Sequence, residues 1–238
     1  MIWLDRTWPA PAENLACDEA LLDWCDEAGG EVLRFWEVAE HFVVVGYANK
    51  AAVEVNLPAC AWHRVGVFRR CSGGGTVLQG PGCLNYTLIL QIPEHGWLAS
   101  ISGTNQFIMR RHREAMEGLL GRAVTVSGHT DLALDGRKFS GNAQRRKRRA
   151  LLFHGTLLHG FDLALIGKFL NFPSQQPDYR QDRAHGEFVM NLPLSPERIK
   201  ERLRETWQAE EAPSGWPWPA VQQLAVEKYA TEAWNLKF

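Results

Sequence analysis

Hydrophobic residues recur along the chain with two different periods, which predict a mixture of helices and strands. Between residues 14 and 28 the apolar positions follow helical spacing, and Gly29-Gly30 supplies a C-terminal stop. Further helices are predicted over 104–120, 163–170, 196–210 and 219–234, with Pro196 and Pro219 in the first turns. Strands are predicted over 32–36, 42–45, 65–68, 76–78, 84–92 and 124–126.

A two-residue turn, Asp135-Gly136, predicts a hairpin between strands at 131–134 and 138–143. Helices and strands do not alternate regularly along the chain, which disfavours a Rossmann sheet. The pattern therefore predicts an α/β (α+β) protein with a mixed sheet.

The most informative polar segment joins two of the predicted strands. Arg69 and Arg70 enter Cys71-Ser72 and three consecutive glycines, Gly73 to Gly75. Glycine lets a ligand approach the main chain closely, so the loop's N–H groups can hold a phosphate or carboxylate, with an arginine adding a charged fork. The alternative is a flexible hairpin. Neither the GxxxxGK[ST] nor the GxGxxG spacing is present.

Lys138 follows the Asp135-Gly136 turn and precedes the small-residue run Ser140-Gly141-Asn142-Ala143. Small residues at this point let a ligand press against the strand, which favours a binding role for the lysine. The alternative is an ordinary solvated lysine beside a turn.

Several blocks in this order resemble the lipoate-protein ligase and octanoyl/lipoyl transferase family. They are 69–77, Asn85-Tyr86, 130–132, 136–138, 140–144 and 154–158, and the resemblance extends to 18–22, 228–229 and 234–235. The resemblance covers essentially the whole chain. It implies the biotin-synthetase-like fold, which is related to the class II aminoacyl-tRNA synthetases.

The resemblance also implies a site. In this family the strand lysine contacts the acyl carbonyl and phosphate, a role that falls to Lys138 as the catalytic residue. The residues that match the family's acyl-adenylate-binding positions are Arg70, Ser72, Gly73, Gly74, Gly75, Thr76, Val77, Asn85, Asp131, Ser140, Gly141, Ala143, His154, Gly155 and Thr156. His154 has a second interpretation as a buried, hydrogen-bonded histidine, and Val77 and Leu78 line either an acyl tunnel or the core.

The implied reaction uses ATP, Mg²⁺ and lipoate. The carboxylate of lipoate, or of octanoate, attacks the α-phosphate, and the acyl group then passes from acyl-AMP to a lysine of a lipoyl carrier protein or domain. Mg²⁺ is expected mostly on nucleotide oxygens and water, with Asp131 as its first candidate protein ligand.

Two alternatives remain. One is ATP-independent transfer of octanoyl or lipoyl between carriers, which some branches perform through a cysteine thioester. Residues 125–130 and 150–152, where those branches place the cysteine, contain none, and Cys71 and Cys83 are unmatched. The other is a non-enzymatic module that binds acyl-AMP. Gln79-Gly80 stands where many ligases have His-Asp, and no C-terminal accessory domain is apparent, so a separate accessory ligase subunit is a candidate partner.

Composition agrees with a single catalytic domain over residues 1–238, because 45% of residues are apolar and 212–219 suits a turn better than a linker. A net charge of −1 argues against nucleic-acid binding. No apolar run is long enough for a membrane, no secretory signal is evident, and five cysteines lack CxxC spacing, so we expect the reducing cytoplasm. No His/Cys cluster predicts zinc.

The run Arg145 to Arg149 contains five adjacent cations. It predicts either a solvated loop between two strands or a basic rim that attracts an acidic carrier domain. Nucleic-acid binding is a weaker interpretation, because no aromatic residue interrupts the run.

Overall fold

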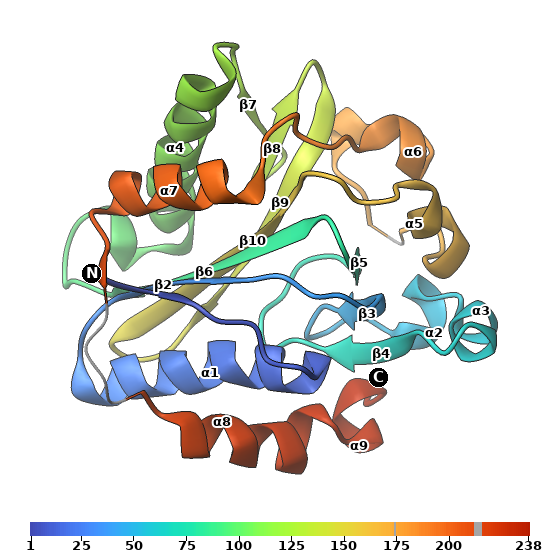
Figure 1. Ribbon diagram of the computed structural model, residues 1–238, viewed down its shortest axis with the longest axis horizontal. Coiled ribbons are helices and arrows are strands. Elements are labelled where there is room, and N and C mark those ends of the chain that lie inside the picture. Colours follow the sequence, from blue (N-terminus) through green and yellow to red (C-terminus); the bar gives the residue numbers. More distant parts are fainter. Residues whose placement is uncertain (174, 212–215) are drawn as a thin grey trace.

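The structure is a computed structural model that describes residues 1–173, 175–211 and 216–238. A large mixed sheet runs through the centre of the molecule (Figure 1). Its strands, in spatial order, are β11 (Glu210–Glu211), β1 (Ile2–Asp5), β2 (Val32–Trp36), β6 (Cys83–Gln91), β10 (Ala150–Leu158), β9 (Arg137–Arg146), β8 (Asp131–Leu134) and β7 (Thr125–Ser127). Strand β1 runs parallel to both of its neighbours, and the other adjacent pairs are antiparallel.

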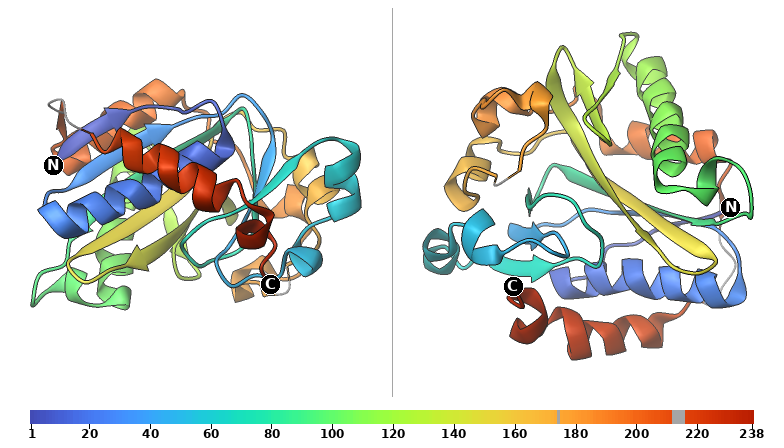
Figure 2. Two further views of the ribbon diagram at one scale, coloured as in Figure 1. Left: turned by 90° about the horizontal axis from the view of Figure 1, so that it is seen from below. Right: turned by 180° about the vertical axis from the view of Figure 1, so that it is seen from behind.

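Helices cover both faces of this sheet. The helices α4 (Ile101–Leu120) and α7 (Pro196–Trp207) pack on the face that carries Leu33, Leu88 and Leu151. The helices α1 (Pro11–Ala28) and α8 (Trp218–Leu224) lie side by side on the opposite face, as Figure 2 shows. Because successive strand residues point to opposite sides, both faces of the central strands are apolar and buried.

A smaller sheet lies beside the large one in the order β4 (Gly66–Arg69), β3 (Phe42–Val45), β5 (Val77–Gln79). Three short helices pack with it around a third apolar cluster, namely α2 (Ala51–Glu54), α3 (Leu57–Trp62) and α5 (Ala164–Phe169). Since β4 and β5 flank β3, the glycine-rich loop that joins them passes over the end of β3. The remaining short elements are η1 (Trp97–Ala99), η2 (Asp178–Arg180), α6 (His185–Phe188), η3 (Ala225–Tyr229) and α9 (Glu232–Asn235).

The predicted mixed-sheet α/β class is confirmed, and the strands at 32–36, 42–45 and 131–134 have the predicted bounds. The helices predicted from residues 14 and 104 begin three residues earlier, at Pro11 and Ile101, and two other helix predictions are wrong in their C-terminal parts. Helix α7 ends at Trp207 because Gln208 adopts a left-handed conformation, and residues 210–211 pair with β1 instead. The single helix expected over 219–234 is split into α8, the π-helical turn η3 and α9.

Strand β1 and the short helices α2, α3 and α6 were not predicted, because each is too brief to establish a period. The turn expected over 212–219 falls partly outside the described residues. The single domain stays a prediction. None of the helices in the described part of the chain combines the length and apolar character needed to cross a membrane.

Candidate functional site

Two rows of side chains cross the large sheet on the face covered by α1. One row runs from Arg34 through Thr87 and His154 to Ala143, as successive partners on β2, β6, β10 and β9. The next row runs through Asn85 and Thr156 to Gly141. A row of polar residues is unusual on a buried face, because each buried polar group must find a hydrogen-bond partner. Both rows end on β9, where the candidate site lies.

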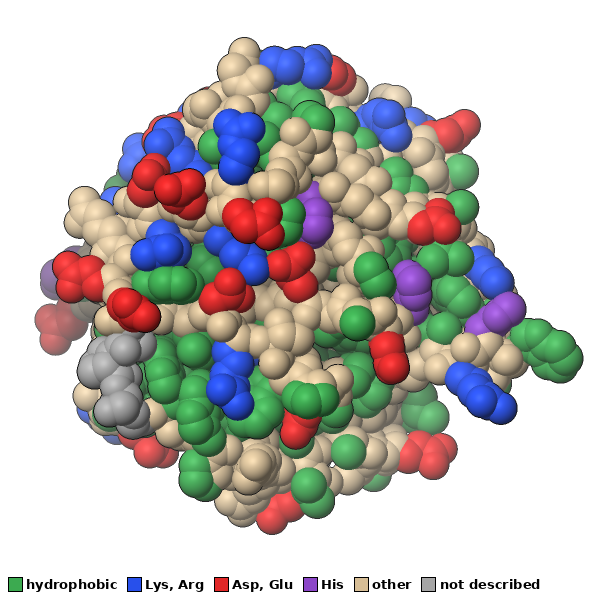
Figure 3. All heavy atoms as spheres, viewed as in Figure 1, with side chains coloured by type: hydrophobic (Ala, Val, Ile, Leu, Met, Phe, Trp, Pro, Cys, Tyr) green, Lys and Arg blue, Asp and Glu red, His purple; other side chains and the backbone are tan. Residues whose placement is uncertain are grey.

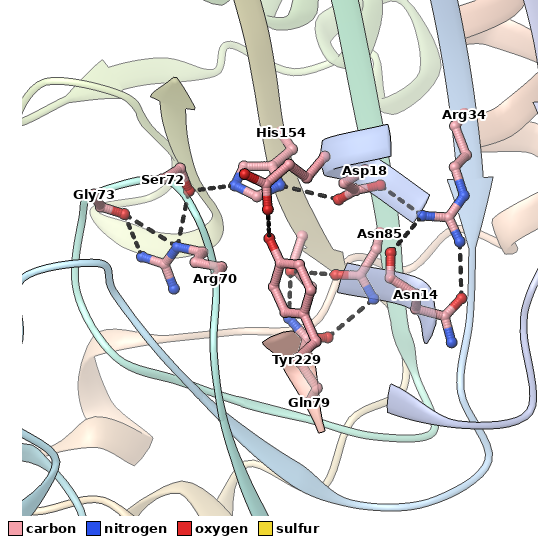
Figure 4. Close-up of polar contacts among 12 residues, drawn as sticks. Asn14, Asp18, Arg34, Arg70, Ser72, Gly73, Gln79, Asn85, His154 and Tyr229 are labelled. Atoms are coloured by element: carbon pink, nitrogen blue, oxygen red, sulfur yellow. Dashed lines mark hydrogen bonds and ion pairs between the residues drawn. The ribbon is translucent and has the colours of Figure 1, made fainter. Parts of the chain in front are cut away.

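Arg70 holds the glycine loop from the inside. Its side chain is 8% exposed, and its guanidinium donates to the carbonyls of Gly73 (2.6 Å) and Gly75 (2.7 Å) and to Ser72 Oγ (3.1 Å). Figure 4 shows the arginine enclosed by the loop it binds. Burial lowers the pKa of Arg70 to about 10, so the guanidinium remains charged at neutral pH.

Arg69 is also directed away from the predicted ligand. Its side chain is fully buried and donates to the carbonyls of Gly46, Tyr47 and Asn49, and to those of Trp234 and Asn235. The sequence suggested that one of the two arginines would add a fork for an anion, whereas the structure uses both to bind backbone carbonyls. The assignment of Arg70 to the acyl-adenylate stays a prediction.

The grip of Arg70 leaves the loop's own donors free. The C=O and N–H groups of a trans peptide point in opposite directions, so carbonyls of Gly73 and Gly75 that face inward turn the N–H groups of Gly74 and Thr76 outward. Within the described residues, no backbone N–H from Gly73 to Thr76 donates to another protein group. The three glycines are exposed. The loop therefore presents neutral donors to solvent, as an anion-binding nest does.

Lys138 lies beside this loop. Its Nζ is 2.8 Å from Asp131 Oδ1, and the other oxygen of Asp131 accepts a hydrogen bond from Tyr179 Oη at 2.7 Å. A side chain at Gly141 would have its Cβ only 2.6 Å from Lys138 Nζ, so the ammonium lies directly over that glycine. The predicted strand position of Lys138 is confirmed, and the lysine is paired rather than simply solvated.

Strand β9 forms a common floor for the loop and the lysine. Gly74, at φ +85°, packs against the Cβ of Ala143, while Lys138 Nζ lies above Gly141. Alternate residues of a strand share a face and are about 7 Å apart. The free loop amides and the ammonium thus stand over neighbouring positions of one strand face.

A buried chain of polar groups leads away from the loop. Ser72 Oγ is 2.5 Å from His154 Nε2, and His154 Nδ1 is 3.1 Å from Asp18 Oδ2. The second oxygen of Asp18 pairs with Arg34 at 2.5 Å. Burial alone would raise the pKa of Asp18, but Arg34 and the hydrogen bond to His154 together lower it. His154 is therefore hydrogen-bonded on both ring nitrogens, as one sequence interpretation expects, and it also contacts the glycine loop. Its role in binding an acyl-adenylate stays a prediction.

In the row through Asn85 and Thr156, the side chains form a closed cycle of hydrogen bonds with Gln79. Gln79 Nε2 donates to Thr156 Oγ1 at 2.8 Å, Thr156 donates to Asn85 Oδ1 at 2.6 Å, and Asn85 Nδ2 donates to Gln79 Oε1 at 3.0 Å. Gln79 and Asn85 are buried. Gln79, which departs from the family pattern, hence joins β5 to the sheet and keeps both amides satisfied.

Asn142, which was not predicted as a site residue, and the predicted Gly155 support this floor. Asn142 accepts from Tyr86 Oη at 2.5 Å and donates to the carbonyl of Thr130 at 2.5 Å, which fixes the strand between Ser140 and Ala143. At Gly155 a Cβ would lie 1.8 Å from Asn142 Oδ1, so only glycine fits beside that amide. Leu78 is buried in the apolar cluster of the small sheet, and Val77 packs on the cluster beneath α1.

The chain's five cysteines are all buried. Burial raises the pKa of Cys71 to about 12 and that of Cys83 to about 12. A thiol nucleophile needs a lowered pKa and access to its substrate. Both candidate cysteines have the opposite character.

Three of the five cations in the basic run Arg145 to Arg149 bind groups of the protein itself. Arg146 donates to the carbonyls of Leu98 and Ala99, Lys147 pairs with Asp23 at 2.5 Å, and Arg149 binds the carbonyl of Glu27. Arg145 and Arg146 end β9, so the predicted loop is shorter than expected. Arg145 and Arg148 are exposed, and neither donates to a protein acceptor within the described ranges. Elsewhere on the surface, Figure 3 shows cations and anions interspersed.

Asp18, Arg34 and Tyr179 were not predicted as site residues. Arg34 carried a signal, because a charged residue within the apolar segment 32–36 needs a buried partner. Tyr179 had none, since it lies in the single helical turn η2, far from Asp131 in sequence. No three His, Cys, Asp or Glu side chains within residues 1–173, 175–211 and 216–238 form a group that could hold a metal ion.

The chain is similar in sequence to several known proteins. Residues 10–206 match the family described as lipoyl protein ligase A/B catalytic domain. The chain is 26% identical to octanoyltransferase LipM of Halalkalibacterium halodurans over 95% of both proteins. It is 32% identical to "Putative lipoate-protein ligase A" of Aeropyrum pernix over 87% of this chain and 74% of that protein.

Solved structures of similar fold include a lipoate-protein ligase A bound with ATP, with a TM-score of 0.85, 22% identity and coverage of 99% and 98%. A bi-partite lipoate protein ligase from Thermoplasma acidophilum, described with its E2 lipoyl domain, has a TM-score of 0.84, 22% identity and coverage of 99% and 95%. A T. acidophilum protein with bound lipoic acid has a TM-score of 0.83, 21% identity and coverage of 100% and 98%.

Proposed function

Because the chain belongs to the lipoyl protein ligase A/B catalytic domain family, we propose that it activates lipoate or octanoate with ATP and transfers the acyl group to a lysine of a carrier protein. The observation that carries this proposal is the glycine loop with its outward N–H groups beside Lys138. An acyl-adenylate has a phosphate next to an acyl carbonyl, and this pair of donors suits both. Solved relatives with ATP and with lipoic acid support the same substrates.

The first step forms a bond between a carboxylate oxygen of the acid and the α-phosphorus of ATP, and pyrophosphate leaves. Charge grows on the phosphate oxygens as the bonds change. The amides of Gly74 and Thr76 would stabilise that charge from a backbone that is already fixed by Arg70. Lys138 would bridge the carboxylate and phosphate oxygens, for which it must exchange its contact with Asp131.

In the second step the carrier lysine attacks the acyl carbon as a neutral amine. The amide C–N bond forms, the bond to AMP breaks, and the amine proton is released. Lys138 would stabilise the negative charge that develops on the carbonyl oxygen and on the departing phosphate. The reaction needs no covalent enzyme intermediate.

Mg²⁺ would arrive with the nucleotide and neutralise its phosphate charge. Both oxygens of Asp131 already contact Lys138 or Tyr179, but each retains a lone pair that could reach a metal ion or its water shell. Asp131 remains our candidate protein ligand, and nucleotide oxygens and water would supply the others.

The second candidate function, ATP-independent transfer of octanoyl or lipoyl between carriers, is favoured by the similarity to octanoyltransferase LipM. The buried cysteines favour the ligase instead, because Cys71 and Cys83 offer no reactive thiol for a thioester route. A non-enzymatic acyl-adenylate binder would share the site but release no product.

The proposed partner is a lipoyl carrier with an acidic surface near its lysine. Tyr47, which donates its backbone N–H to Ser72, is 36% exposed and lies next to the loop. Two cations contact its ring, Lys237 at 3.9 Å and Arg145 at 5.6 Å from the centroid. This aromatic and cationic surface would attract the carrier to the loop. A separate accessory subunit is proposed on the likeness to the bi-partite ligase. The free cysteines support a reducing, cytoplasmic setting.

One experiment separates the three functions. The purified protein is incubated with lipoate, ATP, Mg²⁺ and a lipoyl domain, and the mass of the domain is measured, while a parallel reaction replaces lipoate and ATP by octanoyl-loaded carrier. The ligase predicts a lipoylated domain only when ATP is present. Transfer without ATP supports the transferase, and pyrophosphate release without domain modification points to the accessory subunit. Binding of the adenylate without either product would leave only the binding module.

A further inference from the structure

Asp18 and Arg34 do not approach the space above β9, yet they are linked to the glycine loop by direct contacts. Figure 4 shows the order Arg34, Asp18, His154, Ser72, Arg70. The five residues come from β2, α1, β10 and the loop, and no side chain in the series is more than slightly exposed. Asn14, one helical turn before Asp18, accepts from the other end of the Arg34 guanidinium at 2.8 Å and keeps it aligned.

The series has a definite direction of hydrogen bonding. Asp18 lies against a buried guanidinium and is a carboxylate, so it can only accept. When the His154 ring is neutral, it must then carry its proton on Nδ1, which leaves Nε2 as an acceptor. The Ser72 hydroxyl donates to Nε2, and its lone pairs face Arg70 Nε at 3.1 Å.

This direction matters because Ser72 is one of the groups that hold Arg70, together with the carbonyls of Gly73 and Gly75. If His154 carried its proton on Nε2, Ser72 Oγ would accept from both the histidine and Arg70 Nε, and its own proton would lose the acceptor it has in Nε2. A buried donor without a partner is costly, so the Ser72 hydroxyl would shift toward another acceptor and loosen its hold on Arg70. The amides of Gly74 and Thr76 would then be less firmly directed outward.

We propose that Asp18 and Arg34 are positioning residues that fix the tautomer of His154 and, through Ser72 and Arg70, the direction of the anion-binding amides. The effect on catalysis rests on the proposed function, whereas the tautomer is a property of the protein alone. A serine, histidine and aspartate in series also resemble a nucleophilic triad. Ser72 has no exposed surface and already binds Arg70, which favours the positioning role.

The tautomer is measured by ¹⁵N NMR of protein labelled at histidine, with the His154 signals identified by their loss in His154→Gln. We expect the wild-type ring, at a pH where it is neutral, to carry its proton on Nδ1, and Asp18→Asn to shift the population toward Nε2. A wild-type ring protonated on Nε2, or an unchanged ratio in Asp18→Asn, overturns the proposal. The wild-type measurement needs no variant and no activity.

The kinetic test compares Asp18→Asn, Ser72→Ala and the double variant by pyrophosphate release. Each single change should lower the rate on the order of 10- to 100-fold, as for residues that orient another ligand, and the double variant should be no slower than Ser72→Ala alone. Asp23→Asn is the matched control, since it makes the same change on the same helix at a residue paired with Lys147. If the rate loss of the double variant equals the product of the two single losses, Asp18 and Ser72 act independently and the proposal is wrong. An acyl group found on Ser72 by intact mass would show that Ser72 is a nucleophile and not a positioning residue.

Discussion

The glycine loop and the β9–β10 turn are both rich in arginine in the sequence, yet the fold uses their charges differently. At the loop, Arg69 and Arg70 are buried and donate to backbone carbonyls, so that the neutral backbone amides of the loop face outward. At the turn, Arg146 and Arg149 bind carbonyls of neighbouring segments and Lys147 pairs with Asp23.

The difference lies in what each region leaves unpaired. The loop leaves backbone N–H groups with a fixed direction, which can select a phosphate by geometry. The turn leaves Arg145 and Arg148, whose exposed charges act at a distance and are screened by salt. A run of cations in a sequence therefore does not identify the group that binds the ligand. That group is known only when the structure shows which donors are already bound within the protein.

Removal of Lys138 should have the largest effect, because it carries the only charge that we place against the reacting atoms. Lys138→Ala should fold normally and lose acyl transfer by about 3 kcal/mol or more. Lys138→Arg should also fail, since a planar guanidinium is too large for the space above Gly141. Lys147→Ala, which removes the same charge from the turn, is the control. Near-normal turnover by folded Lys138→Ala would exclude this lysine from the mechanism.

A substitution of each bracing arginine tests the comparison directly. Arg70→Lys replaces the planar fork that donates to the carbonyls of Gly73 and Gly75 together by a single ammonium, and we expect a stability loss of about 2 kcal/mol together with roughly tenfold weaker binding of an acyl-adenylate analogue. Arg146→Lys removes the same kind of brace at the turn and should lower stability alone. Thermal unfolding and calorimetric titration give the two quantities. Equal losses of analogue affinity in both variants would mean that the loop has no special role.

A smaller effect is expected at the exposed cations. Arg145→Ala with Arg148→Ala should weaken the apparent affinity for the carrier about fivefold and flatten its salt dependence, because each exposed ion pair is worth roughly 0.5 kcal/mol. Pyrophosphate release with lipoate alone should not change. The control removes Arg113 and Arg122, which are paired with Glu117 and Asp135 on the α4 side. If both half-reactions slow equally, the turn contacts the nucleotide, and if neither changes, the two arginines are only solvated.

The smallest effect is expected at the cysteine within the loop. Cys71→Ser and Cys83→Ser should each retain activity within about twofold, because burial holds both thiols in their protonated form. Intact mass after incubation with octanoyl carrier checks for a bound acyl group. An acid-stable thioester that hydroxylamine releases from either residue would establish the transferase route instead.

The fold was predictable where a continuous apolar run or a turn motif marks the element. The apolar strands at 32–36 and 42–45 and the Asp135-Gly136 hairpin need only local sequence, and the structure has them where expected. The family blocks also contain the loop and Lys138, whose roles in the site stay predictions. The direction of the Arg70 side chain could not be predicted, because it faces inward only when the carbonyls of Gly73 and Gly75 fold around it.

Long-range partners were equally hidden. His154 meets Asp18 across 136 positions of the chain and Ser72 across 82, and one sequence contains no record of either contact. Arg34 was the one residue with a readable signal, since its charge lies within an otherwise apolar strand. The closed cycle of hydrogen bonds among Gln79, Asn85 and Thr156 likewise depends on the register between β6 and β10.

The most direct test of the central claim is a titration of ¹⁵N-labelled protein with a non-hydrolysable lipoyl-adenylate analogue, followed by amide NMR. If the loop binds the phosphate through donors freed by Arg70, the backbone N–H signals of Gly74 and Thr76 will move strongly downfield, while the Arg70 Nε–H signal stays in place. Unchanged signals at Gly74 and Thr76, with a shift at Arg70 Nε–H, would show that the arginine holds the phosphate and would contradict the account.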